Sequence, residues 1–324
     1  MAERLRFLAT LTIAAGSLFG TLAASAQEAY PNRPIRVLVG YAPGGGSDII
    51  ARLIAQRLQT RLGQPVVIDN RPGAGGTLAV DAVAKARPDG YTILVTPNTA
   101  TMAPALYAKL PFDVVKDLSG VALIATSPMV LIVNPQVPIA SVADLIGYAK
   151  ANPGKLSYST PGIGTPQHLA TELFKAMTST DIEHIPYKGG APAVMAVATN
   201  EVPLSFAAIN SAVPLIEGKR VKAIATSESR VFPQLELPTI GATVQGYDVG
   251  IWYGMMVPAG TPRNIIDLLN AELVQIVQIP EVKDSMSKQG YVAAVAPATE
   301  MDAQVRSEVD KWTRAAKQAG LKRQ

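Results

Sequence analysis

The chain repeats a short aliphatic run, a loop of small residues and an amphipathic stretch, and few folds accommodate that order. The first group of units predicts strands at 35–39, 66–68 and 91–95, followed by helices at 49–62, 78–86 and 103–107. The second group predicts strands at 156–158, 182–187, 203–206 and 221–226, and helices at 167–177, 191–199 and just before Glu217. Strands and helices that alternate at this length are typical of α/β layers with mainly parallel strands.

Two interruptions divide this pattern. The units stop near 112–118 and resume with aliphatic runs at 121–125 and 130–133, after which Ser141 marks a helix start as its N-cap. A Pro- and Gly-rich connection then leads to a strand and three helices, at 250–258, from Pro262 onward, at 281–289 and at 298–320. One strand with three helices is too little for a third domain, so we expect these elements to return to the first block.

Such a return requires two crossings between two domains, which implies a cleft with a hinge. We therefore predict a first lobe of residues 27–125 plus 248–324 and a second lobe of residues 126–247. The hinges are expected near Ala125–Met129 and Tyr247–Trp252, where the chain crosses. Packing at the crossing is the favoured role for Trp252 and Tyr253, and ligand contact is the less favoured one.

The first 26 residues have the features of a signal peptide. Arg4 and Arg6 form a basic start, residues 7–22 are apolar, and Ala24-Ser25-Ala26 fits the small-x-small cleavage rule. A membrane anchor is less favoured, because the apolar run is short and the cleavage site follows it directly. No later run approaches ~20 apolar residues, so we expect a soluble, periplasmic protein that begins at Gln27.

Composition narrows the function further. Without the leader, 298 of the 324 residues remain, and the charges fall from 29 basic and 25 acidic to 27 and 24 with the loss of Arg4, Arg6 and Glu3. That length suits two domains. A net charge of +3 without a basic-aromatic stripe argues against nucleic acid. There is no cysteine, so disulfides, thiolate catalysis and thiolate metal sites are excluded.

The most informative loop, Tyr41–Asp48, lies between the first strand and its helix. Its glycines leave backbone N–H groups accessible, and a helix N-terminus favours an anion at the carboxyl end of a strand. Nucleotide motifs fail, because Ile49 stands where a third glycine is required and no Lys-Ser or Lys-Thr follows. Ligand contact is predicted for six residues here: Ala42, Gly44, Gly45, Gly46, Ser47 and Asp48.

A second glycine loop, Asn70–Thr77, repeats the design one unit later. Two such loops at the same end of neighbouring strands predict a concave surface of backbone amides. The contact residues expected from this loop are Gly73, Ala74, Gly75, Gly76 and Thr77. Arg71 could bind a carboxylate in bidentate fashion, but a surface ion pair with Asp69 or Asp48 is slightly favoured.

Small and hydroxyl residues also follow the later strands, at 96–101, 159–165, 187–190, 208–211 and 226–227. Ordinary turn and cap chemistry would explain any one of these loops. Together they suit a polar ligand held by many neutral hydrogen bonds, and Thr96 and Thr99 are candidates from the first of them.

Catalysis finds little support in the chain. Only two histidines occur, and a structural role is favoured for both His168 and His184. No Gly-x-Ser-x-Gly elbow surrounds Ser47, and two histidines without clustered carboxylates make a transition-metal site improbable. We expect no enzyme activity, no metal and no cofactor. The alternative of a periplasmic enzyme would rely on Ser47, Asp48 or His168.

Seven motifs in order carry a resemblance over essentially the whole mature chain: Tyr30–Arg36, Pro43–Asp48, Asn70–Gly76, Asp89–Thr92, Gly164–Leu169, Pro186–Gly189 and Pro258–Pro262. The chain resembles the Bug-type, or TctC-type, extracytoplasmic solute receptors of tripartite tricarboxylate transporters. The resemblance implies a type II periplasmic-binding-protein fold. It also implies a small carboxylate ligand, integral-membrane transporter subunits as partners, and a role as a monomer.

The resemblance further implies that both glycine loops hold a ligand carboxylate through backbone amides and ordered water. The second lobe would contribute Ser159, Thr160, Gly164, Thr165, Tyr187, Asn210 and Thr226. Ligands of the family include di- and tricarboxylates, acidic amino acids and aromatic carboxylates. Many relatives carry an acid within the segment that matches 202–210, and this chain has none. That difference favours a plain carboxylate over an amino acid. A ligand sensor for a membrane signalling partner remains the alternative function.

Overall fold

The computed structural model describes residues 30–228 and 236–318, and the described chain from Arg33 onward forms one compact unit. The predicted signal peptide lies outside the described residues. Within the described ranges, no helix is both long and apolar enough to span a bilayer.

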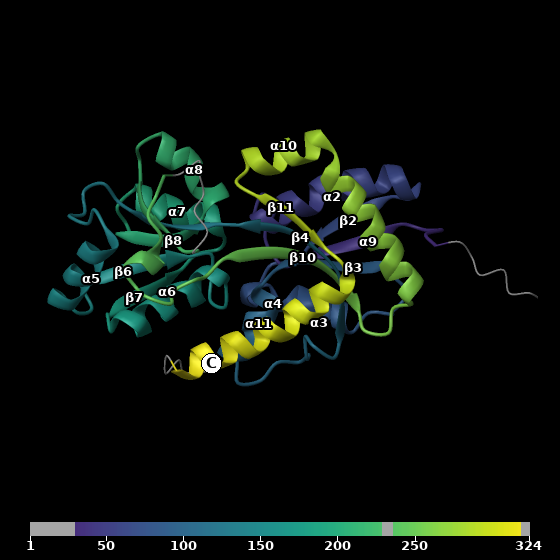
Figure 1. Ribbon diagram of the computed structural model, residues 1–324, viewed down its shortest axis with the longest axis horizontal. Coiled ribbons are helices and arrows are strands. Elements are labelled where there is room, and N and C mark those ends of the chain that lie inside the picture. The colour runs from purple at the N-terminus through teal and green to yellow at the C-terminus, as the bar shows by residue number, and fades with distance from the viewer. Residues whose placement is uncertain (1–29, 229–235, 319–324) are drawn as a thin grey trace, which may run out of the picture. The chain divides into compact units, whose positions relative to one another are not determined.

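The first lobe is built on a six-stranded sheet in the order β11-β4-β10-β3-β1-β2. β1 pairs in parallel with β2 and β3, whereas β10 runs antiparallel to both β3 and β4. Figure 1 shows α3, α4 and α11 on one side of this sheet and α2, α9 and α10 on the other. The strands are β1 (Ile35–Val39), β2 (Val66–Asn70), β3 (Thr92–Pro97), β4 (Leu118–Ser127), β10 (Ile251–Pro258) and β11 (Val292–Ala296).

The helices of the first lobe pack their apolar faces on its sheet. One core cluster joins Val80 and Val83 of α3, Met301 and Val305 of α11 and the sheet residues Leu38, Leu94, Trp252 and Met256. The helices are α2 (Gly46–Leu62), η1 (Ala74–Gly76), α3 (Thr77–Ala84), α4 (Thr99–Leu106), α9 (Arg263–Gln278), α10 (Pro280–Lys288) and α11 (Ala298–Gln318). The C-terminal helices thus pack on the first sheet, which confirms the predicted return.

The second lobe contains a five-stranded sheet in the order β7-β6-β8-β5-β9. Its α7 and α8 pack on one core cluster, while Phe174 of α6 meets the rings of Phe206 and Tyr247. The strands are β5 (Met129–Val133), β6 (Leu156–Thr160), β7 (Ile182–Pro186), β8 (Leu204–Ala208) and β9 (Lys222–Thr226). The helices are α5 (Val142–Ala151), α6 (Pro166–Thr178), α7 (Gly190–Ala198), α8 (Ile209–Glu217) and η2 (Ile240–Ala242).

Two α/β lobes are therefore confirmed, but the expectation of mainly parallel strands was wrong. Among the described strands, five of the nine pairings are antiparallel. Four of them involve β5 or β10, which enter their sheets from the other lobe and run back along their neighbours, and the fifth joins the edge strand β11 to β4. The edge strand β11 was not predicted, since its alanine-rich run lacks a β-branched pattern. Ser141 caps α5 as expected. Pro262 was predicted at the first helical position of α9, but it is the N-cap, one position earlier.

Two histidines lie in the second lobe behind the loop that joins β6 to α6. The rings of His168 and His184 stand 4.2 Å apart, and Tyr158 stacks on His184 at 4.9 Å. Nε2 of His184 lies 2.6 Å from the Thr160 hydroxyl. Burial lowers the pKa of His184 to about 3, with His168 and Lys175 acting in the same direction. Burial also lowers the pKa of His168.

These depressed pKa values predict that the protein loses stability as the pH falls below ~6.5. An unfolded histidine gains a proton near pH 6.5, whereas the folded rings stay neutral, so protons favour the unfolded chain. We expect the free energy of unfolding, measured by urea titration, to fall by up to about 1.4 kcal/mol per pH unit for each of the two histidines between pH 6.5 and 4.5. His184→Gln should flatten this slope and Lys150→Gln should not. A wild-type slope of zero would contradict the prediction.

Candidate functional site

A cavity of about 270 Å³ lies between the two lobes. That volume falls just below the ~300–1,000 Å³ of typical ligand pockets, so a small molecule fits it. The first lobe contributes the first glycine loop together with Pro97, Ile251 and Tyr253. The second lobe contributes Pro161, Pro166, Gln167, Lys188, Gly189, Gly190, Ala191, Pro192, Ala208, Asn210 and Ser211.

The first glycine loop forms one wall of this cavity through Tyr41–Ser47. α2 begins at Gly46, and its N-cap Gly45 makes no side-chain cap hydrogen bond. The first N–H groups of a helix lack partners within the helix, and they carry the positive end of its dipole. The predicted contact residues Ala42, Gly44, Gly45, Gly46 and Ser47 all line the cavity, and the helix start among them suits an anion.

Within this wall, side chains from elsewhere in the chain come closest to the backbone at Gly46. A Cβ at this position would lie 2.7 Å from the Tyr253 hydroxyl, 3.1 Å from the Tyr291 hydroxyl and 3.4 Å from Nδ2 of Asn210. Tyr291 donates to the carbonyl of Gly46 at 3.1 Å and accepts from Asn210 at 3.0 Å. A chain of hydrogen bonds therefore runs from the glycine loop to α8 of the second lobe.

Asp48 shapes the loop from behind and is not among the residues that line the cavity. The residue is 2% exposed, and its side chain accepts from the Gly44 amide, Arg52 and Nδ2 of Asn70, each at 2.9 Å. Burial acts to raise the pKa of Asp48, but these hydrogen bonds outweigh it and hold the pKa below its usual value. The Gly44 amide is thus committed to Asp48, so the N–H groups at the start of α2 are the ones in this wall that could bind an anion.

The second glycine loop packs against the second lobe and is not part of the cavity lining. A Cβ on Gly75 would lie 2.5 Å from the carbonyl oxygen of Ile163 and 3.3 Å from Cα of Gly164. The Gly76 amide donates to Gly73, and Thr77 donates to Ala74. The loop is therefore a contact between lobes, and its contact with a ligand stays a prediction. Arg71 pairs with Asp69 at 3.1 Å, as the favoured interpretation expected.

The third loop turns its hydroxyl groups into the first lobe. Thr96 donates to the carbonyl of Pro97 at 3.0 Å, and the Thr99 hydroxyl lies 2.6 Å from that of Tyr41. Tyr41 also donates to the carbonyl of Gly75 at 2.9 Å, so it braces the two glycine loops against each other. Pro97 and Tyr41 line the cavity, whereas Thr96 and Thr99 do not.

Most of the residues predicted in the second lobe hold its loops in place. Ser159 donates to Ala193, Tyr187 donates to Glu201, and Thr165 caps α6 by accepting from the His168 amide. Thr160 contacts His184, and Gly164 donates to Nδ1 of His168 at 3.4 Å. The buried Thr226 hydroxyl has no hydrogen-bond partner in the described chain. Of the seven predicted residues, Asn210 lines the cavity, and ligand contact by the other six stays a prediction.

Five polar side chains that line the cavity were not among the predicted contacts: Tyr41, Gln167, Lys188, Ser211 and Tyr253. Gln167 is the second residue of α6, Lys188 follows β7, and Tyr253 lies on β10. Lys188 is the single charged residue of the lining, and it has no ion pair within residues 30–228 and 236–318. The sequence signals for it were its place in the loop after a strand, before two glycines, and in the motif Pro186–Gly189. Tyr253 could not be placed, because its site depends on the antiparallel return of β10.

The geometry offers no arrangement for nucleophilic catalysis around the cavity. His168 is 8% exposed, sits behind the β6–α6 loop and does not line the cavity. Asp48 is occupied by its three hydrogen bonds. Among the described residues, no group of three or more histidine, aspartate or glutamate side chains could hold a metal ion. The arrangement can bind and orient an anion between two lobes.

Comparison with known proteins finds a matching family and similar solved structures. A family model described as the tripartite tricarboxylate transporter family receptor, TctC, matches residues 50–321. The solved structure of Rpa4515 from R. palustris with adipate has a TM-score of 0.85 and 35% identity, covering 90% of this chain and 98% of its own. The periplasmic binding protein BugD gives 0.85 and 32%, covering 91% and 100%. MatC (Rpa3494) from Rhodopseudomonas palustris with bound malate gives 0.82 and 30%, covering 89% and 100%.

The crowding at Gly46 predicts that Gly46→Ala weakens ligand binding. The added methyl group must displace the Tyr253 hydroxyl, which lies in the cavity wall. Gly147, inside α5, is a matched control because a Cβ there meets nothing within 4 Å. Gly147→Ala should raise the free energy of unfolding by about 0.5–1 kcal/mol and leave binding unchanged. Thermal unfolding with and without adipate measures both effects, and equal ligand shifts in the two variants would contradict the prediction.

Proposed function

Because this chain belongs to the tripartite tricarboxylate transporter receptor family, we propose that it captures a small dicarboxylate between its lobes and delivers it to integral-membrane transporter subunits. It is a carboxylate-binding transport receptor, and its family consists of periplasmic receptors. We infer in addition that it is exported by its cleaved leader, acts as a monomer and turns over no substrate.

The proposal of a dicarboxylate rests on two features of the same small cavity that each attract a negative charge. The start of α2 presents backbone N–H groups from the first lobe, and Lys188 presents an ammonium group from the second. One carboxylate on the amides and another near Lys188 would use both features. The protein with adipate and the protein with malate, both similar to this chain, each hold a dicarboxylate.

The same lining supports a plain dicarboxylate over an acidic amino acid. None of the 21 residues that line the cavity carries an acidic side chain. The ammonium group of an amino acid would lose water on entering the cavity and find no carboxylate there, which costs binding free energy. Asn210 and Ser211 remain available as neutral partners for the middle of the ligand.

Lobe closure is the proposed mode of capture. We take residues 27–125 plus 248–324 and residues 126–247 as the two moving bodies, with hinges near 125–129 and 247–252. Pro128 alone separates β4 from β5, so the first crossing is short enough to act as a hinge. The hydrogen bond from Asn210 to Tyr291 joins the bodies beside the cavity and would favour the closed arrangement.

Lys188→Gln tests the placement of the second carboxylate. We expect adipate affinity, measured by calorimetry on the mature protein, to fall about tenfold, because a partly solvated charged hydrogen bond is lost. Affinity for hexanoate, which lacks the second carboxylate, should change little. Lys188→Arg should recover most of the loss, and Lys150→Gln on α5 is the matched control. Failure of a full panel of C4–C6 dicarboxylates to bind the wild-type protein would reject the proposal.

Tyr291→Phe tests the link between the lobes. The variant removes the Tyr291 hydroxyl, which accepts a hydrogen bond from Asn210 and donates one to the Gly46 carbonyl. This loss should destabilise the closed arrangement by about 1 kcal/mol. We expect adipate to bind several-fold more weakly, and small-angle scattering to show less compaction at a fixed adipate concentration. Tyr148→Phe removes a hydroxyl on α5 and should have no effect. Full compaction of Tyr291→Phe at the wild-type concentration would exclude this role.

A further inference from the structure

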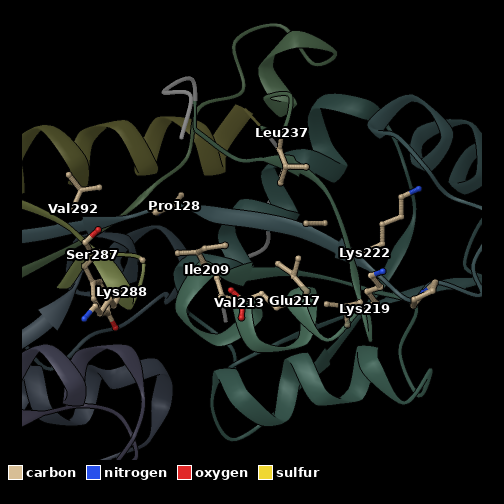
Figure 2. A pocket seen from close by; sticks show the side chains of 16 residues that line it. Pro128, Ile209, Val213, Glu217, Lys219, Lys222, Leu237, Ser287, Lys288 and Val292 are labelled. Carbon is tan, nitrogen blue, oxygen red and sulfur yellow. The ribbon is translucent and has the colours of Figure 1, made fainter. Parts of the chain in front are cut away.

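A second and larger cavity, of about 700 Å³, opens between the lobes on the other side of the Asn210–Tyr291 bond. α8, β9 and Leu237 of the second lobe form one side of it, and the end of α10 with the start of β11 forms the other (Figure 2). Pro128 of the first crossing also lines it. This cavity shares no lining residue with the carboxylate site.

The lining of this cavity is chemically different from that of the carboxylate site. Its surface is mainly aliphatic, from Ile209, Val213, Ile216, Val221, Leu237 and Val292. Lys219, Lys222 and Lys288 stand at its edges against one acid, Glu217. Figure 2 shows Lys288 on the side of α10 and β11, and Lys219 and Lys222 at the opposite side. None of these four charged side chains makes an ion pair within the described part of the chain.

We propose that this cavity is a second binding site, which takes an organic monoanion with an apolar body, such as a medium-chain carboxylate. Aliphatic walls would bury the apolar body, and the excess of lysine would select a negative head group. The volume falls within the ~300–1,000 Å³ of small-molecule pockets. A stable protein partner would instead need about 800 Å² from each side, far beyond one cavity. The inference stands apart from the proposed dicarboxylate function.

The wall between the two cavities gives the second site a physical connection to the first. Tyr291 lines the large cavity and is 3% exposed, while its hydroxyl bonds Gly46 and Asn210 of the carboxylate site. Ile209 lines the large cavity, and its neighbour Asn210 lines the small one. A ligand that packs on Ile209 and Tyr291 therefore acts on the lobe contact itself. Any resulting change in adipate affinity must be matched by an equal change in the affinity of the second ligand.

Methyl-resolved NMR tests the site with decanoate as the probe and no dicarboxylate present. The mature protein is labelled at isoleucine, leucine and valine methyl groups. We expect saturable shifts at Ile209, Val213, Leu237 and Val292, and none at Ile251, which lines the carboxylate site. Adipate, added separately, should move Ile251. Because the two probes report on separate methyl groups, failure of one site is distinguishable from failure of the other.

Variants at the edge of the cavity decide whether charge selects the ligand. Lys222→Gln combined with Lys288→Gln changes two exposed side chains and should weaken decanoate binding about tenfold. Lys150→Gln, an exposed lysine on α5, should leave it unchanged. The proposal is overturned if the four methyl groups show no saturable shift at millimolar decanoate, if decanoate moves Ile251 instead, or if Lys150→Gln weakens binding as much as the double variant.

Discussion

The buried carboxylate of Asp48 is the interaction on which the carboxylate site depends. Its three hydrogen bonds tie the Gly44 amide, α2 and the end of β2 together, and Asn70 extends the network to the carbonyl of Tyr41. A charged group that is 2% exposed must be satisfied internally, because an unpaired buried charge costs several kcal/mol. The glycine loop is consequently fixed before any ligand arrives. A negative charge within the protein thus fixes the loop whose neighbouring amides, at the start of α2, are proposed to bind a negative charge from outside.

Local patterns predicted the elements well and the site only in part. The β1 strand, the capped α5 and the return of the C-terminal helices follow from periodicity, cap chemistry and length. The first glycine loop was predicted to contact the ligand, because three glycines before a helix have few other uses. Asp48, Thr99 and Thr165 bond the scaffold and do not line the cavity, so their contact with a ligand stays a prediction; a polar residue beside a site can face either the ligand or the scaffold. Only the packing distinguishes the two.

Residues whose position depends on long-range pairing could not be predicted. Tyr253 reaches the carboxylate site because β10 inserts antiparallel beside β4, and Tyr291 reaches the carbonyl of Gly46 because β11 pairs antiparallel with β4; no local pattern indicates either register. Tyr187 was predicted to contact the ligand, and its neighbour Lys188 was not. In the structure Lys188 lines the cavity, whereas Tyr187 bonds Glu201. Alternation along an extended segment separates such neighbours, and the exact end of β7 decides which one faces the ligand.

The contact between Gly75 and Gly164 has a consequence for how such a receptor can change its ligand. Both residues have positive φ, and the backbone of Gly75 lies directly against the backbone of residues 163–164, with the Tyr107 ring beside Gly164. If the lobes close as proposed, this main-chain contact limits how far they approach, and substitution of the residues that line the cavity does not move it. Side chains such as Gln167, Lys188 and Ser211 can vary without altering how far the lobes approach. The extent of lobe closure is thereby separated from ligand selectivity. Related receptors can keep the same closure while their ligand changes.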